Sequence, residues 1–454
     1  MDTIAAIATA QKASAVGIVR ISGDSTAKIL SALFTPANGL SELPPRRMIY
    51  GTVHNKDGTV LDHALAVRFS AQHSYTGEES AELHCHGSPV VLNEVLSACF
   101  AAGARQAKAG EFTKRAFLNG RMDLTEAEAV IDLIDAETAE AARNAALQMD
   151  GALSRLVDKS YDTLLGITSR FYAVVDYPDE DIEDLTRGQT EAALTETETA
   201  LSRLLATYDR GRILKSGAAT AIIGAPNAGK SSLLNALVGF DRAIVTDIAG
   251  TTRDTVEEKA VVGGVLLRLI DTAGIRETDN AVEKIGVERS RKAVEQADLV
   301  LALMDGSRPL TDEDAAILRL AQGSGKPWIF VQTKKDLTKN AVSVGVIGDG
   351  AAKSVAISSV TGGGLDALES AIAAIFPHGD VPEGTLLTNA RQKDAVQRAL
   401  TSVRAAKDAL ATGMTPDVVL TEAEAAMNAL GELTGRTARE DMVARIFERF
   451  CVGK

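Results

Sequence analysis

The sequence is poor in cysteine and has no long apolar run, and each shortage excludes a class of protein. Three cysteines, Cys85, Cys99 and Cys451, cannot form the disulfide framework of a small secreted domain, and they fit a reducing cytosol. The longest apolar run, near residues 299–304, is far too short to span a bilayer, and the first residues lack the basic start of a signal peptide. We therefore expect a cytoplasmic protein without a membrane span.

Aromatic residues and positive charge are also scarce. Aromatics make up 4% of the chain, Trp328 is its single tryptophan, and the formal net charge is −13. A free-standing nucleic-acid binder needs clustered lysine and arginine, and a base-stacking platform needs aromatics. Any contact with RNA is therefore expected to use a local patch or a partner's help. The most basic stretch of the N-terminal third lies between Arg105 and Arg121, where composition alone favours a solvated helix face.

The length and the residue patterns predict several domains. With 454 residues, the chain exceeds what one hydrophobic core supports. The first part mixes predicted strands with short helices, and residues 4–21 alternate like one buried strand. His84 and His86 flank Cys85 in a later strand, where the histidines face one side and the cysteine the other. Because no second ligand pair with zinc-like spacing follows, ordinary strand histidines are favoured over a metal site.

Long amphipathic helices are predicted from about residue 125 to 212, where apolar residues recur at three- and four-residue steps. The same pattern returns at 389–411 and 421–432. The simplest interpretation is a helical bundle that is interrupted in sequence by an inserted domain. The predicted fold class is therefore a multidomain combination of α/β and all-α parts: an N-terminal α/β domain (1–118), a discontinuous helical bundle (119–215 and 379–454) and an inserted Ras-like P-loop domain (216–378).

The inserted domain begins with a phosphate-binding motif. Apolar residues 221–223 lead into Gly224, and Gly229-Lys230-Ser231 follows after four further residues, which matches G-x-x-x-x-G-K-[ST] at a strand-to-helix transition. The glycines permit a tight loop whose amides point at phosphate oxygens, and the helix N-terminus adds positive potential. Lys230 would reach the β- and γ-phosphates, and the Ser231 hydroxyl would bind Mg²⁺.

Three further motifs follow in the order expected of a GTPase. Residues 250–252 lie where a switch loop would supply a second hydroxyl to Mg²⁺, and residues 271–274 (Asp-Thr-Ala-Gly) can complete the metal shell and meet the γ-phosphate. Residues 333–336 (Thr-Lys-Lys-Asp) end in an aspartate that can bind both N1–H and the exocyclic amine of guanine, which selects GTP over ATP. Residues 358–360 lie where a last loop would cap the base.

Two residues bear on how GTP would be hydrolysed. Ile275 stands directly after the Asp-Thr-Ala-Gly motif, where Ras-type enzymes have the glutamine that orients water, so hydrolysis must be organised differently. Asn227 within the phosphate loop offers a neutral oxygen that could bind a monovalent cation beside the phosphates. Such a cation could replace the charge of an arginine finger.

Characteristic segments recur along nearly the whole chain. They are Val-Arg-Ile-Ser-Gly (19–23), Tyr-Thr-Gly-Glu-Glu (75–79), His-Gly (86–87), Gly-Glu-Phe-Thr-Lys-Arg-Ala-Phe-Leu-Asn-Gly (110–120), Asp-Leu-Thr-Glu-Ala-Glu-Ala (123–129), the phosphate loop (224–232), Thr-Asp-Ile-Ala-Gly-Thr-Thr-Arg-Asp (246–254) and Cys-Val-Gly-Lys (451–454). With these segments the chain resembles the tRNA-modification GTPases of the MnmE (TrmE) family. The last segment, together with an inserted GTPase domain, is highly specific to that family.

The resemblance implies a folate-binding N-terminal domain that forms a homodimer, a discontinuous helical domain and an inserted G domain. It also implies a heterotetramer with an FAD- and NADH-dependent partner of the MnmG (GidA) type. Together the two proteins would add an aminomethyl or carboxymethylaminomethyl group at C5 of the tRNA wobble uridine. The one-carbon unit would come from 5,10-methylene-tetrahydrofolate, for which 5-formyl-tetrahydrofolate is an analogue.

The resemblance also assigns roles to residues of the flanking domains and of the hydrolytic site. The residues that would contact the folate are Arg20, Glu82, Arg121 and Lys454. Glu283 would position the attacking water, and the candidate catalytic residues are Glu283, Lys230 and Cys451. The Cys451 thiol could be a nucleophile or only a packed residue of the tail.

The remaining candidates bind the nucleotide and its cations. Ser231 and Thr252 would bind Mg²⁺. The K⁺ ligands would be Asn227 of the phosphate loop and Thr246, Ile248 and Thr251, of which the last three lie in a loop that orders when two G domains meet. The candidate GTP-binding residues are Asn227, Ala228, Gly229, Lys230, Ser231, Ser232, Thr246, Asp247, Ile248, Ala249, Gly250, Thr251, Thr252, Asp271, Thr272, Ala273, Gly274, Thr333, Lys334, Lys335, Asp336, Ser358, Ser359 and Val360.

Three positions depart from the family pattern. Ala109 stands where the family usually has proline, and Thr333 and Ser359 replace the common asparagine and alanine of the guanine loops, which bears on affinity rather than on the identity of the nucleotide. An alternative of a different class is a ribosome-assembly type GTPase switch that binds RNA without modifying it. The candidate folate residues and the C-terminal Cys-Val-Gly-Lys favour the enzyme.

Overall fold

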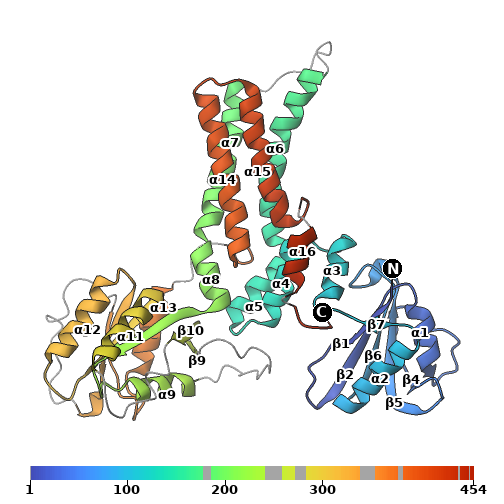
Figure 1. Cartoon of the computed structure of the whole chain (residues 1–454), viewed down its shortest axis with the longest axis horizontal. Coiled ribbons are helices and arrows are strands. Elements are labelled where there is room, and N and C mark those ends of the chain that lie inside the picture. The colour runs from blue at the N-terminus through green and yellow to red at the C-terminus, as the bar shows by residue number, and fades with distance from the viewer. Residues whose placement is uncertain are drawn as a thin grey trace. The chain divides into compact units, whose positions relative to one another are not determined.

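The structure, a computed structural model, describes residues 2–176, 186–240, 258–270, 283–337, 353–376, 382–437, 440–448 and 450–453 (Figure 1). The chain forms two compact units. Unit 1 comprises Met1–Ile131, Gln148–Leu201 and Ala395–Lys454, and unit 2 comprises Asp132–Leu147 and Ser202–Asp394. None of the helices in the described ranges has both the length and the apolar character that crossing a membrane requires.

A mixed sheet forms the N-terminal part of unit 1, with its strands in the order β3-β4-β5-β6-β2-β1-β7. Helices α1 and α2 cover one face, where Val19, Ile21 and Leu92 are buried (Figure 1). Pro89 starts α2 at a position where its missing amide costs nothing. The elements are β1 (Ile4–Ile7), β2 (Ser14–Ser22), α1 (Thr26–Leu33), β3 (Phe34–Pro36), β4 (Ile49–His54), β5 (Val60–Phe69), the 3₁₀ helix η1 (Ala71–His73), β6 (Ser80–Gly87), α2 (Pro89–Ala101), β7 (Arg105–Gln106) and α3 (Glu111–Leu118).

Residues 4–21, predicted as one buried strand, form two strands instead, so that prediction was wrong. Strands β1 and β2 run antiparallel, with Ile4 opposite Ser22 and Ile7 opposite Val19. The residues between them, 8–13, reverse the chain without a glycine or a proline. Because these two residue types are the usual signs of a turn, the sequence pattern alone does not reveal this reversal.

The other face of the sheet exposes apolar and histidine side chains. This surface, the open face, consists of Val16, Ile18, Tyr50, His63, Leu65 and His84. Tyr50 is 56% exposed and packs beside Leu65, which is 38% exposed, while the Tyr50 ring stacks on His63 with 6.4 Å between the ring centroids. Sheets with one solvated face usually present polar residues there. The open face is therefore unusually apolar for a surface in contact with water.

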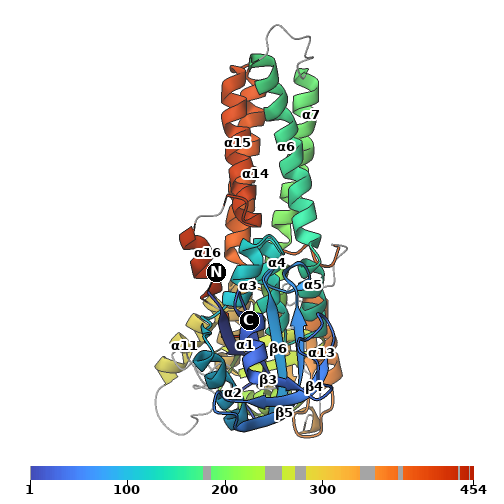
Figure 2. The same cartoon turned by 90° about the vertical axis from the view of Figure 1, so that its right-hand side faces the viewer.

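Four long helices, most of whose residues belong to unit 1, make up a bundle, and they come from two distant parts of the sequence. Helices α6 (Ala152–Asp176), α7 (Arg187–Ala206), α14 (Ala390–Ala411) and α15 (Pro416–Thr434) lie side by side in both views (Figures 1 and 2). Glu198 on α7 accepts hydrogen bonds from Arg404 and Lys407 on α14, both at 2.9 Å. Tyr172 on α6 donates to Glu424 on α15 at 2.7 Å. These contacts confirm the prediction of a bundle that is split in sequence.

The last described residues of the chain return to the N-terminal part of unit 1. Helix α16 (Glu440–Phe447) packs with α4 (Leu124–Ile134), and Phe447 and Phe450 are buried there. The Gly110 amide donates to the Cys451 carbonyl at 3.2 Å, and Ala109 pairs with Val452 in an antiparallel bridge. Gly110 has a φ of 63°, and a Cβ at this position would lie 2.6 Å from the Phe447 carbonyl. Only glycine fits this junction without a shift of the tail.

A second, largely parallel sheet organises unit 2, with its strands in the order β13-β12-β11-β8-β10-β9. Its central strands are almost wholly apolar, as expected for strands that are covered on both faces. Helices α9 and α13 bury one face and helices α11 and α12 the other. The elements are β8 (Ala218–Gly224), α9 (Lys230–Phe240), β9 (Glu258–Val262), β10 (Val265–Ile270), α11 (Glu283–Gln296), β11 (Leu299–Asp305), α12 (Asp312–Gly323), β12 (Trp328–Thr333), the 3₁₀ helix η2 (Lys335–Leu337), β13 (Lys353–Ala356) and α13 (Leu365–Ile375).

Helical residues that precede the strands also belong to unit 2. Helix α5 (Ala139–Met149) and helix α8 (Tyr208–Ser216) are joined by an ion pair between Glu140 and Arg210 at 2.9 Å. Arg212 on α8 forms two hydrogen bonds, of 2.7 and 3.2 Å, with Asp298, which directly precedes β11. Helix α8 is thus fixed to the sheet. The four-part domain division given above stays a prediction.

Candidate functional site

The phosphate loop joins the end of β8 to the start of α9, as the sequence predicts. Asn227 and Gly229 have positive φ angles of 60° and 88°. Gly229 takes this left-handed conformation without strain, whereas a non-glycine residue such as Asn227 takes it at a cost of about 1 kcal/mol. The Asn227 side chain is exposed, and Ala228 is fully buried beneath the loop.

Lys230, the first residue of α9, folds back over this loop. Its Nζ donates to the carbonyl oxygens of Gly224 and Ala225 at 2.8 and 2.9 Å. Burial lowers the pKa of this ammonium group. An ammonium group held by two neutral carbonyls is well suited to exchange them for charged phosphate oxygens, because charge-assisted hydrogen bonds are stronger.

The predicted guanine loop follows β12 and is bonded directly to the phosphate loop. The hydroxyl of Thr333 lies 2.8 Å from the Ala228 carbonyl and 3.1 Å from the Met304 carbonyl. Lys334 has a φ of 56°, and its Nζ donates to Asp305 at 2.6 Å. Asp336 lies in the short helix η2 that follows. The side chain that is predicted to read guanine therefore stands on a loop with fixed ends.

The last predicted loop, at residues 358–360, packs beside the guanine loop. The Lys335 amide donates to the Ile357 carbonyl at 3.0 Å. Ser358 is buried, and its hydroxyl accepts a hydrogen bond from the Thr361 amide at 3.2 Å. Val360 is 86% exposed. Because β8, β11, β12 and β13 run parallel, their carboxyl ends bring these loops to one edge of the sheet, where ligands of such folds bind.

Part of the predicted nucleotide and cation site lies outside the described residues. These positions are Thr246, Asp247, Ile248, Ala249, Gly250, Thr251, Thr252, Asp271, Thr272, Ala273 and Gly274. Glu283 is the first residue of α11, and its side chain is likewise not described. Ser231 stands in the first turn of α9, directly after Lys230. The Mg²⁺ and K⁺ sites and the role of Glu283 therefore stay predictions.

Two of the predicted folate residues form an ion pair on the N-terminal sheet. Arg20 on β2 faces Glu82 on β6, and their side chains meet at 2.9 Å. The second carboxylate oxygen of Glu82 lies 3.1 Å from Nε2 of His84. Arg121 donates to the Gln72 carbonyl at 3.3 Å, and Lys454 is outside the described residues.

Two aromatic residues beside this pair were not among the predicted site residues. The Arg20 guanidinium lies 5.8 Å from the ring centroid of Tyr75 and 5.7 Å from that of Phe112. The Tyr75 hydroxyl is 2.9 Å from the Thr113 hydroxyl. Both aromatics stand within segments that were recognised in the sequence, but only the sheet and helix α3 bring them to Arg20.

Two arginines of the basic stretch from Arg105 to Arg121, Arg105 and Arg115, belong to an ion-pair network. Arg115 is buried and bonds Glu78 at 2.9 Å, Asp2 at 2.7 Å and Glu111 at 3.1 Å. Arg105 also pairs with Asp2 and Glu111. Since their charges are matched within the fold, these arginines are not available for phosphate contacts.

The predicted strand histidines have partners in the sheet. His84 contacts Glu82, and His86 contacts Asp62 at 2.8 Å. Burial raises the pKa of both the Cys85 and the Cys99 thiols to about 12, so neither is a thiolate at neutral pH. Cys451 is exposed in the tail. Of the three cysteines, the tail thiol is thus the accessible one.

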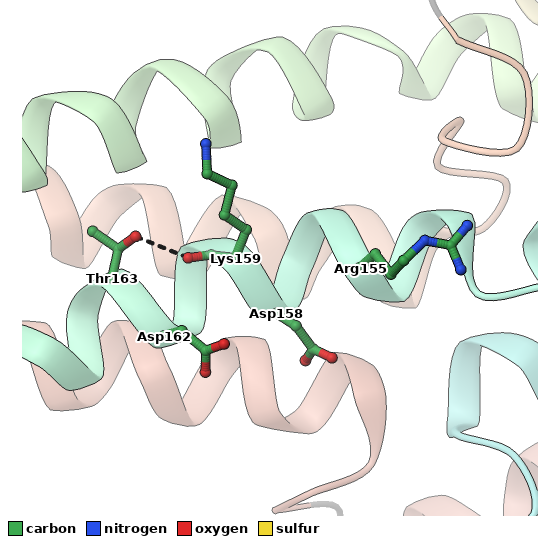
Figure 3. A pocket seen from close by; sticks show the side chains of 5 residues that line it. All are labelled: Arg155, Asp158, Lys159, Asp162 and Thr163. Carbon is green, nitrogen blue, oxygen red and sulfur yellow. Dashed lines mark hydrogen bonds between the residues drawn. The ribbon is translucent and has the colours of Figure 1, made fainter.

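An open pocket of about 510 Å³ lies along α6 in unit 1. Its lining side chains are Arg155, Asp158, Lys159, Asp162 and Thr163 (Figure 3). Figure 3 shows them pointing in different directions rather than toward a common centre. Asp158 pairs with Arg436 and Lys159 with Glu196, both at 2.9 Å. This surface has the character of a solvated helix face.

Comparison with known proteins covers the chain from end to end. Residues 3–121 match a family model described as the N-terminus of the GTP-binding protein TrmE, and residues 124–451 match one described as the MnmE helical domain. Proteins named tRNA modification GTPase MnmE align with all of this chain. The one from Roseiflexus sp. (strain RS-1) is 44% identical over 99% of its own length, that from Streptococcus pyogenes serotype M28 is 42% identical over 98%, and that from Acetivibrio thermocellus is 41% identical over 99%.

Proposed function

Because the chain belongs to the MnmE (TrmE) family, we propose that it is a GTP hydrolase that acts in the modification of the tRNA wobble uridine. The observation that carries this proposal is the joining of the phosphate and guanine loops in unit 2. Lys230 is held at the phosphate loop, and Thr333 ties the guanine loop to the Ala228 carbonyl. A nucleotide with a guanine base and several phosphates fits such a pair of loops.

Replacing Asp336 tests this proposal. The substitution Asp336→Asn removes the carboxylate that accepts from guanine and supplies an amide that can donate to the C2 carbonyl of xanthine. We expect the Kd for GDP to rise about 100-fold, since hydrogen bonds to a charged group are lost, and the affinity for XDP to increase. Titration with fluorescent GDP, XDP and ADP measures both effects. Equal affinity of the unaltered chain for GDP and ADP would overturn the proposal.

The proposed hydrolysis depends on Mg²⁺ and K⁺ and on Glu283. Ser231 and Thr252 would bind Mg²⁺, and Asn227 with Thr246, Ile248 and Thr251 would bind K⁺, which supplies positive charge beside the phosphates. The exposed Asn227 side chain in the phosphate loop supports this role. We expect at least about 10-fold faster turnover in K⁺ than in Na⁺, and loss of this difference in Asn227→Ala. Glu283→Ala is expected to reduce kcat far more than nucleotide affinity.

The proposed one-carbon donor is 5,10-methylene-tetrahydrofolate, bound by Arg20, Glu82, Arg121 and Lys454. A carboxylate such as Glu82 can accept from the N–H groups of a pterin ring, while a guanidinium suits its glutamate tail. In this fold Arg20 and Glu82 are adjacent, and Tyr75 and Phe112 add aromatic surface. Cys451 would take part as the accessible thiol of the tail.

Calorimetric titration of the full-length chain with 5-formyl-tetrahydrofolate tests this site. Binding by the unaltered chain and at least about 10-fold weaker binding by Glu82→Gln are expected. A chain that binds GDP but no folate would instead support a ribosome-assembly type GTPase switch. Glu94→Gln, at an exposed position of α2, is the matched control and should bind folate normally.

The proposed assembly is a homodimer through the N-terminal domain, which joins an FAD- and NADH-dependent partner of the MnmG (GidA) type in a heterotetramer that acts on tRNA in the cytoplasm. The open face supports the homodimer. Apolar side chains such as Tyr50 and Leu65 gain stability when a second copy excludes water from them. The open face also continues, one row along the strands, into the pair formed by Arg20 and Glu82.

A further inference from the structure

Asp305 occupies a buried position at the edge of the sheet that carries the nucleotide loops. It is the last residue of β11, and only 6% of its surface is exposed. One carboxylate oxygen, Oδ1, accepts from the Ser307 amide at 2.9 Å and from the Ser307 hydroxyl at 2.6 Å. The Ser307 amide and hydroxyl both donate to Oδ1, and together they fix the orientation of the carboxylate.

The other oxygen, Oδ2, accepts from Nζ of Lys334 at 2.6 Å. Burial alone would raise the pKa of Asp305, but the hydrogen bonds from Lys334 and Ser307 outweigh it and lower this pKa. Asp305 is therefore charged at neutral pH. A charged and mostly buried pair of this kind is costly to break from one side only.

Lys334 also has a backbone conformation that needs support. Its φ of 56° lies in the left-handed region, which costs a non-glycine residue about 1 kcal/mol. Neighbouring contacts hold the chain on both sides: the Gly306 amide donates to the Thr333 carbonyl, and the Lys335 amide to the Ile357 carbonyl, each at 3.0 Å. Asp305 supplies the side-chain contact at the residue between them.

We propose that Asp305 is a positioning residue of the guanine site, which holds Lys334 so that the loop from Thr333 to Asp336 is formed before the nucleotide arrives. A preformed loop binds more tightly, because the nucleotide does not spend its binding energy on ordering the loop. The inference rests on the proposed GTP-binding function of these loops. The inference goes beyond the proposed function, because it assigns part of the affinity for guanine nucleotides to Asp305, a residue that does not itself touch the base.

A double-mutant cycle in the full-length chain tests this role. Asp305→Asn keeps an acceptor for Ser307 and removes the charge that holds Lys334, and Lys334→Met removes the ammonium but keeps the aliphatic stem. We expect Asp305→Asn to raise the Kd for fluorescent GDP and the KM for GTP about 10-fold, with kcat changed less than about two-fold. In the Lys334→Met background, the same substitution is expected to change the Kd less than about two-fold.

Asp314→Asn is the matched control. Asp314 is a buried carboxylate of unit 2 that pairs with Arg308 at 2.6 Å, so its loss should lower the Tm to a similar extent without changing the Kd for GDP. An equal rise in Kd for Asp305→Asn with and without Lys334 would overturn the positioning role, and so would an unchanged Kd. If the unaltered chain binds no guanine nucleotide, the proposed function itself fails.

Discussion

Thr333 shows how a single departure from a family pattern can be accommodated. Threonine in place of the common asparagine raises the question of how well guanine is bound. In the fold, its hydroxyl lies 2.8 Å from the Ala228 carbonyl, so the guanine loop and the phosphate loop are directly bonded. The position is buried, and the hydroxyl is short enough to fit there. Threonine, although it differs in shape from asparagine, thus joins the two loops through its hydroxyl.

Removing that hydroxyl should weaken nucleotide binding. In Thr333→Val the shape is kept, but the buried Ala228 carbonyl loses its hydrogen bond, at a cost of about 1–2 kcal/mol. We expect the Kd for GDP to rise about 5- to 30-fold. Fluorescent GDP titration measures this, with Thr333→Ser as the control that keeps the hydroxyl and stays within about three-fold of the unaltered chain. Equal losses in both variants would contradict the assigned contact.

At the scale of elements, the sequence is informative wherever a pattern is local. The apolar strands β8, β11 and β12, the long helices and the phosphate loop follow from periodicity and motif spacing, and the structure confirms them. Contacts between distant segments could not be predicted. The turn between β1 and β2 lacks glycine and proline. Arg105 and Arg115 pair with Asp2, and Arg115 also pairs with Glu78, although no local pattern connects these carboxylates to them.

The network around α3 predicts how stability depends on pH. Burial alone would raise the pKa of Glu111, but hydrogen bonds from Arg105, the Lys108 amide and Arg115 lower it to about 2. The stabilisation is fully present above the ordinary pKa of about 4.5 and is lost as the pH falls toward 2. We expect Glu111→Gln to lower the free energy of unfolding of unit 1 by about 2 kcal/mol at pH 7.

Calorimetric unfolding at several pH values checks this prediction. The difference between Glu111→Gln and the unaltered chain should shrink as the pH falls from about 4.5 toward 2, because the carboxylate becomes protonated. Fluorescence of Trp328, which lies in β12 of unit 2, gives an internal control that the substitution should leave unchanged. A difference that stays constant over this pH range would exclude the ion-pair explanation.

At the scale of the whole molecule, the chain forms two units whose segments alternate along the sequence. Helical residues 132–147 precede much of unit 1 in the chain but belong to unit 2. Chain length and residue patterns correctly predict several domains, yet they do not show which helix joins which unit, since amphipathic helices of either unit have the same periodicity. The same limit applies to the open face. The alternation of its strands is ordinary in sequence, and only the strand pairing places Tyr50 beside Leu65.

The open face predicts the behaviour of the molecule in solution. Introducing charge with Tyr50→Glu and Leu65→Glu should prevent a second copy from packing there, because a carboxylate would lose its hydration. We expect the mass measured by sedimentation to fall from that of a dimer to that of one chain, 47.7 kDa. Met414→Glu, at an exposed apolar position next to α14, is the control that keeps the dimer. A dimer that survives both substitutions would place the interface elsewhere.

The junction between Gly110 and the tail also has a consequence for the order of synthesis. The residues that pair with Ala109 and Gly110 leave the ribosome only after every residue of unit 2 has been made. The N-terminal sheet can therefore form early, but its contacts with residues 450–453 wait until translation has passed residue 453. A chain that stops before residue 450 would lack these contacts, although its phosphate loop is already complete. These contacts thus join the part of unit 1 that is made first to the part that is made after unit 2.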